Sequence, residues 1–258
     1  MRITSAGHAV FAATLIVLGV LGLVQGNFAP AWRPVPHGVP ARELLAHLCA
    51  LVSLACGIGL LSRRTAATAA GVLLGYLLLW FVSFRVTGVI RAPAAQDSWS
   101  GAGETLVYVA GAWVLHARFA TRRGRERLAF AAGESGMRIA KRLYGLALVP
   151  FGVAHFTDLR ETASLVPAWL PAHVALAYLT GSAFLAAALA IIVGWQPRWA
   201  ATLSTLQMGL FTLLVWAPIV AAGPDPLQWS EFVISWTLTA GAWVVADSYR
   251  DDARPSVS

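Results

Sequence analysis

The sequence is short of charged residues and of cysteine. Only 12% of its 258 residues are Asp, Glu, Lys or Arg, whereas 58% are hydrophobic. A soluble domain carries about 25% charged residues, so the deficit excludes an ordinary globular core and indicates that lipid is the solvent. The only cysteines, Cys49 and Cys56, lie in one apolar run. On a helix they would be about 10 Å apart, too far for a disulfide, so we expect them to be packing residues.

The motifs of the common soluble enzymes are missing as well. The sequence contains no phosphate-binding glycine loop, no G-x-S-x-G nucleophile elbow, no H-E-x-x-H and no C-x-x-C. Ligand sets that would hold a haem, a flavin or an iron–sulfur cluster are not recognisable either. The first apolar stretch is followed by residues without a clear small-x-small cleavage site, so we do not expect a cleaved signal peptide.

Long hydrophobic runs are what the sequence has instead. A helix needs about 20 apolar residues to cross the hydrocarbon core of a bilayer. Five runs meet this length clearly, at 8–26, 44–61, 66–84, 174–194 and 199–222, and three shorter or more polar ones lie at 101–117, 139–156 and 232–246. The flanking charges alternate between the two sides only if all eight runs cross. The sequence therefore predicts an all-α integral membrane protein with eight transmembrane helices.

The distribution of Lys and Arg predicts the orientation of these helices. Of the 19 basic residues, 14 fall in one set of loops and termini and five in the other. Cytoplasmic loops carry the excess of basic residues, so both termini are expected in the cytoplasm and the protein in the inner (plasma) membrane. The net charge of +7 then reflects topology, and we expect no nucleic-acid partner. Tryptophans near the predicted membrane surfaces fit this frame as an aromatic belt; they are Trp32, Trp99, Trp169 and Trp229 outside, and Trp195 and Trp199 inside.

The two halves of the sequence resemble each other. Seven of the 16 positions in the window 99–114 are identical to their counterparts in the window 229–244, including both tryptophans. Gly19 and Gly26 align with Gly145 and Gly152 at an offset of 126. We therefore predict two four-helix repeats, which must run parallel because four is an even number of crossings. The predicted domains are a first repeat at 1–118, a basic cytoplasmic linker at 119–138, a second repeat at 139–248 and a cytoplasmic tail at 249–258.

Ionisable and polar residues gather at the predicted outer ends of the helices, where they are candidates for function. The second repeat contributes a candidate ligand pocket of His155, Asp158, Trp169, His173, Tyr178 and Glu231, and the first repeat a counterpart of Glu43, His47, Arg85 and Glu104. The stiff segment 167–171 is expected to cap the second bundle. Three interpretations remain open for this cluster. The residues pair in the headgroup zone, they bind an amphipathic molecule such as a quinone or a lipid, or His155, Asp158 and His173 bind a metal. No compact motif with metal-ligand spacing is present, so no metal is predicted.

Part of the second repeat resembles the DoxX-like family of small bacterial membrane proteins. The resemblance rests on His155-Phe156, on the run from Ser164 to His173 and on Ala177-Tyr178-x-Thr180-Gly181, and it covers about residues 139–248. The first repeat is a poorer copy. The resemblance implies a four-helix membrane bundle, which would here be present as a fused pair. Some members of the family are linked to thiosulfate:quinone oxidoreduction or to redox-stress complexes.

Three functions follow as alternatives. The first is a scaffold or partner-binding subunit of a membrane redox or envelope-maintenance system. The second is a quinone- or lipid-binding oxidoreductase subunit with a pocket in the outer leaflet, and quinone is the only cofactor that the sequence brings into consideration. The third is a small-molecule transporter, which parallel repeats would suit. The expected partners are the lipid bilayer and a membrane or redox subunit.

Overall fold

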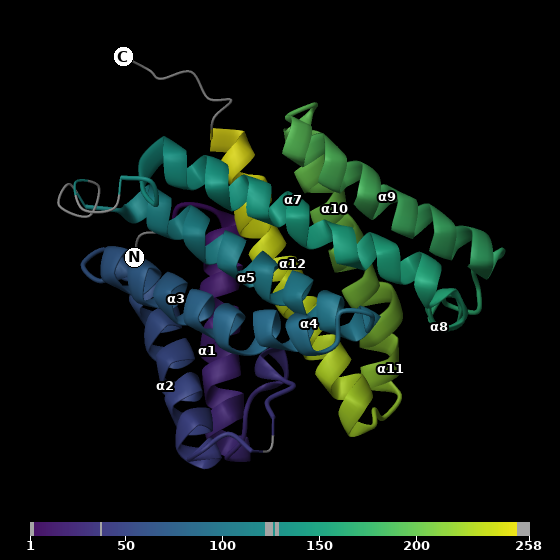
Figure 1. The fold of residues 1–258 in the computed structure, drawn as a ribbon, viewed down its shortest axis with the longest axis horizontal. Helices are drawn as coiled ribbons and strands as arrows, with labels where there is room; N and C mark the ends of the chain where they lie inside the picture. Colours follow the sequence, from purple (N-terminus) through teal and green to yellow (C-terminus); the bar gives the residue numbers. More distant parts are fainter. Residues whose placement is uncertain (1–2, 37, 122–125, 127–128, 252–258) are drawn as a thin grey trace.

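The chain is helical throughout the part that the structure describes (Figure 1). This structure is a computed structural model, and it describes residues 3–36, 38–121, 126 and 129–251. The first half consists of α1 (Ala6–Gln25), the short 3-10 helix η1 (Pro30–Trp32), α2 (Arg42–Leu61), α3 (Ala66–Trp80), η2 (Phe81–Val86), α4 (Thr87–Arg91) and α5 (Gln96–Phe119). The second half consists of α7 (Gly133–Thr157), α8 (Leu159–Ser164), α9 (His173–Val193), α10 (Pro197–Leu210), η3 (Phe211–Trp216), α11 (Ala217–Ala221) and α12 (Pro226–Asp251).

Two of the long helices change their winding near one end. The segments η2 and η3 are π-helical, and each joins a longer α-helix to a five-residue one without a break. A π-helical turn shifts the residues after it around the helix axis, and such turns frequently occur at functional sites. They begin at Phe81 and at Phe211, so they recur at the offset that relates the two tryptophan windows of the sequence.

Among the described residues, five helical stretches are long and apolar enough to cross a membrane: Ala6–Gln25, Arg42–Leu61, Ala66–Arg91, His173–Val193 and Pro197–Ala221. They expose large aliphatic side chains, and Leu44, Leu48 and Leu51 on α2 are each about half exposed. A contiguous apolar surface of this kind is suited to lipid. The other three predicted spans correspond to α5, α7 and α12, which have 24 to 26 residues but a more polar composition.

Two of the more polar helices, α5 and α12, lie between other helices. In Figure 1, α5 crosses α12 near the centre of the molecule. Around this pair, α1, α2 and α3 lie on one side and α7, α9 and α10 on the other. Most of the second part of α5, from Val107 to Leu115, is buried. Because α5 and α12 face neighbouring helices in place of lipid, their sequences do not need an apolar residue at every turn.

The central helices connect the two halves by an exchange of contacts. Helix α5 packs against α3 of its own half but most extensively against α7 of the other, while α12 packs against α10 and also against α1. The sequence predicted two four-helix bundles side by side. In the structure, the last helix of each half packs against the first helix of the other half, so neither half closes a bundle of its own.

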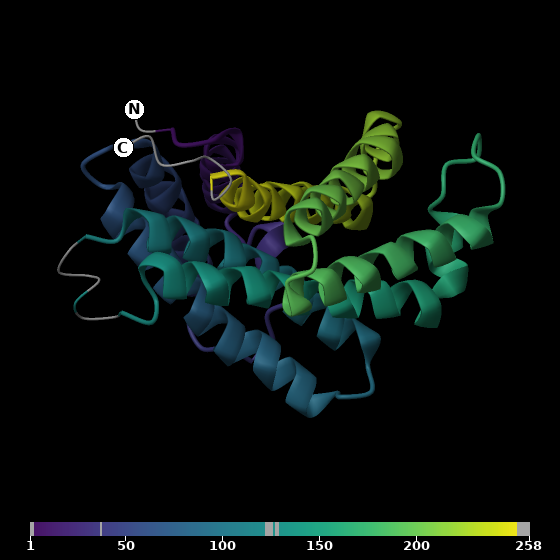
Figure 2. The ribbon, with the colours of Figure 1, turned by 90° about the horizontal axis from the view of Figure 1, so that it is seen from above.

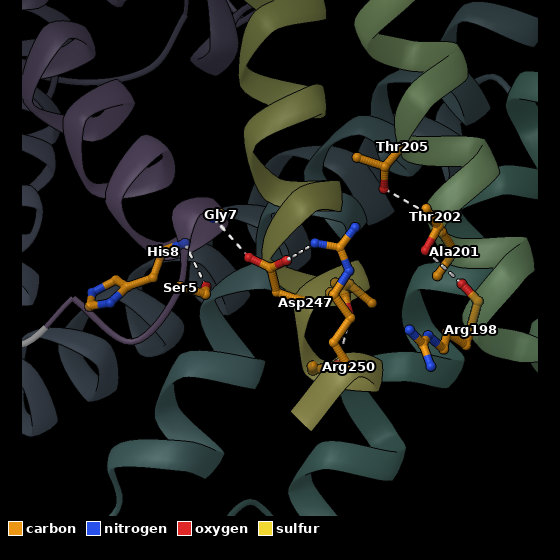
Figure 3. A network of polar contacts seen from close by, with 11 residues as sticks. Ser5, Gly7, His8, Arg198, Ala201, Thr202, Thr205, Asp247 and Arg250 are labelled. Atoms are coloured by element: carbon orange, nitrogen blue, oxygen red, sulfur yellow. Dashed lines mark hydrogen bonds and ion pairs between the residues drawn. The ribbon is translucent and has the colours of Figure 1, made fainter. Parts of the chain in front are cut away.

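A hydrogen bond between the two halves joins the start of α1 to the end of α12 (Figure 3). The Gly7 N–H, in the first turn of α1, donates to Oδ2 of Asp247 on α12 at 2.9 Å. Asp247 is buried and also pairs with Arg250 at 3.4 Å. The first N–H groups of a helix have no partner within the helix and carry its positive dipole, so a carboxylate there satisfies and stabilises them. The side chain of Ser5 caps the same turn by accepting from the His8 N–H.

The first helix pair of each half crosses at a glycine. A Cβ added to Gly19 of α1 would lie 2.7 Å from the carbonyl oxygen of Ala50 on α2, and one added to Gly152 of α7 would lie 3.0 Å from that of Gly181 on α9. Because each glycine makes the same kind of close contact in its own half, Gly19 and Gly152 align with each other, at an offset of 133 residues. The sequence alignment of Gly19 with Gly145 was therefore wrong, because equally spaced glycines allow two registers and only the close approach of the helices selects one.

Two further expectations have clear outcomes. Cys49 and Cys56 are both buried free thiols, as the interpretation of packing residues required. Trp32 is not part of an aromatic belt: it is 1% exposed, whereas Trp169 is 70% exposed and Trp195 is 73% exposed.

Helix boundaries also differ from the prediction. Helix α7 begins at Gly133, inside the predicted basic linker, and residues 122–125 and 127–128 of that linker lie outside the described part.

Candidate functional site

Two adjoining chambers lie between the halves, at the end where α5 and α12 begin. The first, which we name the charged chamber, has a volume of about 550 Å³. It contains five ionisable side chains from both halves: Arg33, Arg85, Asp97, Glu104 and Glu231. The second, which we name the aromatic chamber, has a volume of about 230 Å³. The two share Ser100, Glu104, Glu231 and Ile234, so a single molecule could extend from one into the other.

Arg85 lies in the π-helical segment η2 and is 5% exposed. Its Nε donates to the Thr105 hydroxyl at 2.9 Å and its Nη2 to the carbonyl oxygen of Arg33 at 2.7 Å. Gly101 on α5 makes room for the guanidinium, since a Cβ there would lie 3.1 Å from Nη1. The guanidinium is therefore fixed by the backbone of one segment and the hydroxyl of another, and it is held at the wall of the charged chamber.

The loop residue Arg33 lines the same chamber from outside the helices. Its Nε donates to the carbonyl oxygen of Phe28 at 2.9 Å. Burial, together with the nearby positive charge of Arg42, lowers the pKa of its guanidinium. An arginine remains protonated despite such a shift, so Arg33 contributes a positive charge at the mouth of the chamber.

Glu104 and Glu231 lie at the junction of the two chambers. Glu104 comes from the third turn of α5 and Glu231 from the second turn of α12. Both are half-buried. An ionised carboxylate offers only acceptors, so this junction favours a ligand group that donates hydrogen bonds. At the offset of 130, Glu231 corresponds to Gly101 and Glu104 corresponds to Ile234. The two halves therefore form one asymmetric site and not two equal ones.

His155 and four aromatic residues line the aromatic chamber, and these four are Phe151, Phe184, Phe211 and Trp216. The His155 ring lies 5.6 Å from Phe184 on α9 and 6.0 Å from Phe211 in η3, measured between centroids, and it is nearly parallel to Phe211. Its Nδ1 lies 2.7 Å from the carbonyl oxygen of Phe151. When Nδ1 carries the proton and donates to that carbonyl, a neutral imidazole keeps Nε2 as an acceptor. Trp216, the last residue of η3, completes this wall.

The structure brings four of the ten predicted site residues together. His155, Glu104 and Glu231 line the aromatic chamber, and Arg85 lines the adjoining charged chamber. The prediction assigned these residues to two separate clusters, one in each repeat. Glu104 and Glu231 converge because α5 and α12 meet at the centre of the molecule, which places the first turns of both helices side by side.

The other six predicted residues line neither chamber. Tyr178 packs its ring against Phe156 at 5.6 Å, and Asp158 precedes α8, where its carbonyl oxygen accepts from Thr162. Glu43 and His47 are exposed on α2, and the His47 ring contacts the Glu43 carbonyl at 2.7 Å. The two remaining residues are Trp169, which is exposed, and His173, the first residue of α9. The segment 167–171 projects at the edge of the molecule in Figure 2 and does not cap either chamber.

Several chamber residues were not identified from the sequence. Asp97 and Arg33 lie in or next to loops, and Phe184 looks like any other core aromatic residue of an apolar helix. Phe211 and Trp216 begin and end the π-helical segment η3, which the structure shows and no sequence pattern indicated. Among the described residues, no group of three or more His, Cys, Asp or Glu side chains is arranged to hold a metal ion.

Comparison with known proteins gave no relative. No protein-family model, no curated protein and no solved structure matches the chain.

Proposed function

We propose that the protein is a membrane-embedded binding protein, built from two tandem DoxX-like four-helix repeats, that holds a small amphipathic molecule in the cavity between the repeats. The observation that carries this proposal is the convergence of Arg85, Glu104, His155 and Glu231 on two adjoining chambers, one charged and one aromatic. These residues come from four different helical segments of both halves.

The order and contacts of the helices support the duplication. The π-helical segments and the five-residue helices after them recur at an offset of 130. Ala41 and Ala172 directly precede α2 and α9, and both adopt a left-handed backbone, with φ of 49° and 54°. An alanine in that region is uncommon. Its recurrence at the same place in both halves supports a common origin for the two loops.

The charges at the two ends of the molecule support the orientation. The start of α1, the end of α12, the α2–α3 turn and the α9–α10 turn lie at one end (Figure 1). In the sequence, 14 of the 19 basic residues fall in or next to these segments and the connection between α5 and α7. By the rule that basic loops stay inside, this end is cytoplasmic and the chambers lie near the extracytoplasmic surface of the inner membrane. A ligand would therefore enter from the outer leaflet or from the space outside.

The energetics of ionisable groups in a membrane explain why a binding site is favoured over a purely structural one. A charged side chain within a membrane helix costs several kcal/mol unless it faces water, a partner or a ligand. Within the described part of the chain, neither Glu104 nor Glu231 forms a salt bridge with Arg85. The charged groups instead line open volume, which a polar head group and its water would fill.

The neighbouring aromatic chamber suits the apolar part of the same ligand. Quinones and lipids combine a polar head with an apolar portion, and the DoxX-like resemblance suggests a quinone within this class. Its reduced form, the quinol, carries the hydroxyl groups that can donate to the carboxylates. We propose a ligand-binding subunit of a membrane redox system as the cellular role. A scaffold function needs neither chamber, and a transporter needs a route to the cytoplasmic end that neither chamber provides.

Native mass spectrometry of the gently extracted full-length protein tests the proposal. We expect a co-purified small molecule on the wild-type protein and a reduced bound fraction in Glu104→Gln and Glu231→Gln, which keep the side-chain shape but remove the charge. Glu43→Gln is the matched control, because Glu43 is an exposed glutamate on α2 away from the chambers.

Two results would contradict the proposal. One is a wild-type protein that retains no small molecule from membranes of its native host. The other is a bound molecule whose occupancy is the same in all three glutamine variants, which would place it on the lipid-facing surface.

A further inference from the structure

The interior of the first half is filled by its own tryptophan. Trp32, from the loop between α1 and α2, is 1% exposed. Its ring lies 5.3 Å from Tyr76, 6.0 Å from Trp80 and 6.3 Å from Tyr108, each in an edge-to-face arrangement. Its indole N–H is buried and has no hydrogen-bond partner among the described residues. Packing alone therefore holds the indole between α3 and α5.

The corresponding interior of the second half is the aromatic chamber. Helices α10 and α12 correspond there to α3 and α5, and Leu238, which lines the chamber, corresponds to Tyr108 at the offset of 130. This offset is the one at which Gly111 of α5 touches Gly241 of α12. The second half thus has open volume at the level where the first half holds an indole.

Both halves contain the same pentapeptide in the same loop. Pro30-Ala31-Trp32-Arg33-Pro34 and Pro167-Ala168-Trp169-Leu170-Pro171 share the pattern P-A-W-x-P. Yet Trp169 is 70% exposed, and its loop projects at the edge of the molecule (Figure 2). Helix α9 begins only four positions after Trp169, whereas α2 begins ten positions after Trp32. The second loop leaves the space open that the first loop fills.

We infer that the aromatic chamber binds the flat aromatic ring of an external ligand, in the place that the Trp32 indole occupies in the first half, and that this ring carries a hydroxyl group. The inference rests on the proposed function and names the chemical class of its ligand. Phe184 and Phe211 offer ring contacts, which aromatic pairs favour beyond simple burial. We assign the hydroxyl group because Glu104 and Glu231 lie at the junction of the two chambers and accept hydrogen bonds when they are ionised.

Calorimetric titration of the purified full-length protein with 2-naphthol tests this inference. Decahydro-2-naphthol is the matched probe, since it has the same carbon skeleton and hydroxyl group but no aromatic ring. We expect the saturated probe to bind about tenfold more weakly, because it loses the contacts with two aromatic side chains. Equal affinity for the two probes would overturn the aromatic assignment and leave the proposed function standing.

Single-residue variants test whether 2-naphthol binds in the aromatic chamber. Leu238→Trp puts an indole into the chamber and should abolish 2-naphthol binding, and Phe211→Leu, a smaller change, should weaken it about tenfold. Leu206→Trp is the control, because Leu206 is exposed on the apolar surface of α10. Size-exclusion profiles show which variants remain folded. Binding that survives both Leu238→Trp and Phe211→Leu overturns the inference.

One alternative occupant is part of the chain itself. If the Trp169 loop folded inward, it would fill the chamber as Trp32 fills the first half. In that case 2-naphthol would bind only to Trp169→Ala, and this outcome also overturns the inference. Failure of the proposed function is recognised separately, since it appears as a wild-type protein without any glutamate-dependent ligand in native mass spectrometry.

Discussion

Gly111 and Gly241 touch each other at the crossing of α5 and α12, although they belong to opposite halves of the sequence. A Cβ added to Gly111 would lie 3.1 Å from the carbonyl oxygen of Gly241 and 3.3 Å from its Cα. Both glycines lie in the sequence A-G-A-W-V, at corresponding positions of the two halves. In the proposed duplication, two corresponding positions that meet in this way lie near the axis that relates the two halves. The absence of a side chain lets the backbones approach closely, as in other membrane helix pairs.

The first prediction concerns this crossing. Gly111→Val should destabilise the protein by about 1–3 kcal/mol, because the larger side chain forces the two central helices apart. Gly75→Val is the matched control, since Gly75 also lies within a helix but a Cβ there has no neighbour within 4 Å. Thermal unfolding in detergent measures both variants. Equal losses for the two would mean that the crossing does not depend on close approach.

The second prediction concerns the two P-A-W-x-P segments. Trp32→Ala should cost about 3–5 kcal/mol, because it removes a large side chain from a packed interior. Trp169→Ala should change stability by no more than about 0.5 kcal/mol, because the side chain is 70% exposed. Chemical or thermal unfolding of the two single variants compares them directly. A large loss from Trp169→Ala would show that this loop packs inward in solution.

Much of the helical frame follows from the sequence because its signals are local. Apolar runs of membrane length predict the five apolar spans found among the described residues, whereas the duplication that the spacing of Trp99 and Trp113 against Trp229 and Trp243 indicates stays a prediction. The exchange of α5 and α12 has no local signal. The packing of α5 on α7 and of α12 on α1 joins residues that are far apart in the sequence, so no local pattern predicts it.

The candidate site was only partly predictable for the same reason. An acidic residue near the end of an apolar helix is conspicuous, so Glu104 and Glu231 could be identified. Glu104 and Glu231 line the same cavity because of the way α5 and α12 cross, and no sequence pattern predicts that crossing. Trp32 and Trp169 have the same local sequence, so their opposite exposures could not be predicted. The chain that follows them differs, because α9 begins four positions after Trp169, whereas α2 begins ten positions after Trp32.

The third prediction concerns the link between α12 and α1 (Figure 3). Asp247→Ala should cost about 1–3 kcal/mol, because it leaves the buried Gly7 N–H without its acceptor. Asp247→Asn keeps an acceptor oxygen and should recover most of that loss. Asp225→Ala is the comparison, since Asp225 accepts from the Gln228 N–H at 2.8 Å in an exposed turn and should cost about 1 kcal/mol or less. Thermal unfolding ranks the three variants, and an equal loss for both alanine variants would contradict the role of Asp247.

The last prediction concerns the orientation in the membrane. Basic residues are retained on the cytoplasmic side, so the termini and the α9–α10 turn should be inside and the segment 167–171 outside. A membrane-impermeant maleimide added to intact cells should label Ala168→Cys, an exposed position in that segment, and should miss Trp195→Cys until the membrane is permeabilised. Cys49 and Cys56 are 2% and 3% exposed and should contribute little background. Labelling of Trp195→Cys alone in intact cells would reverse the orientation, and the chambers would then open to the cytoplasm.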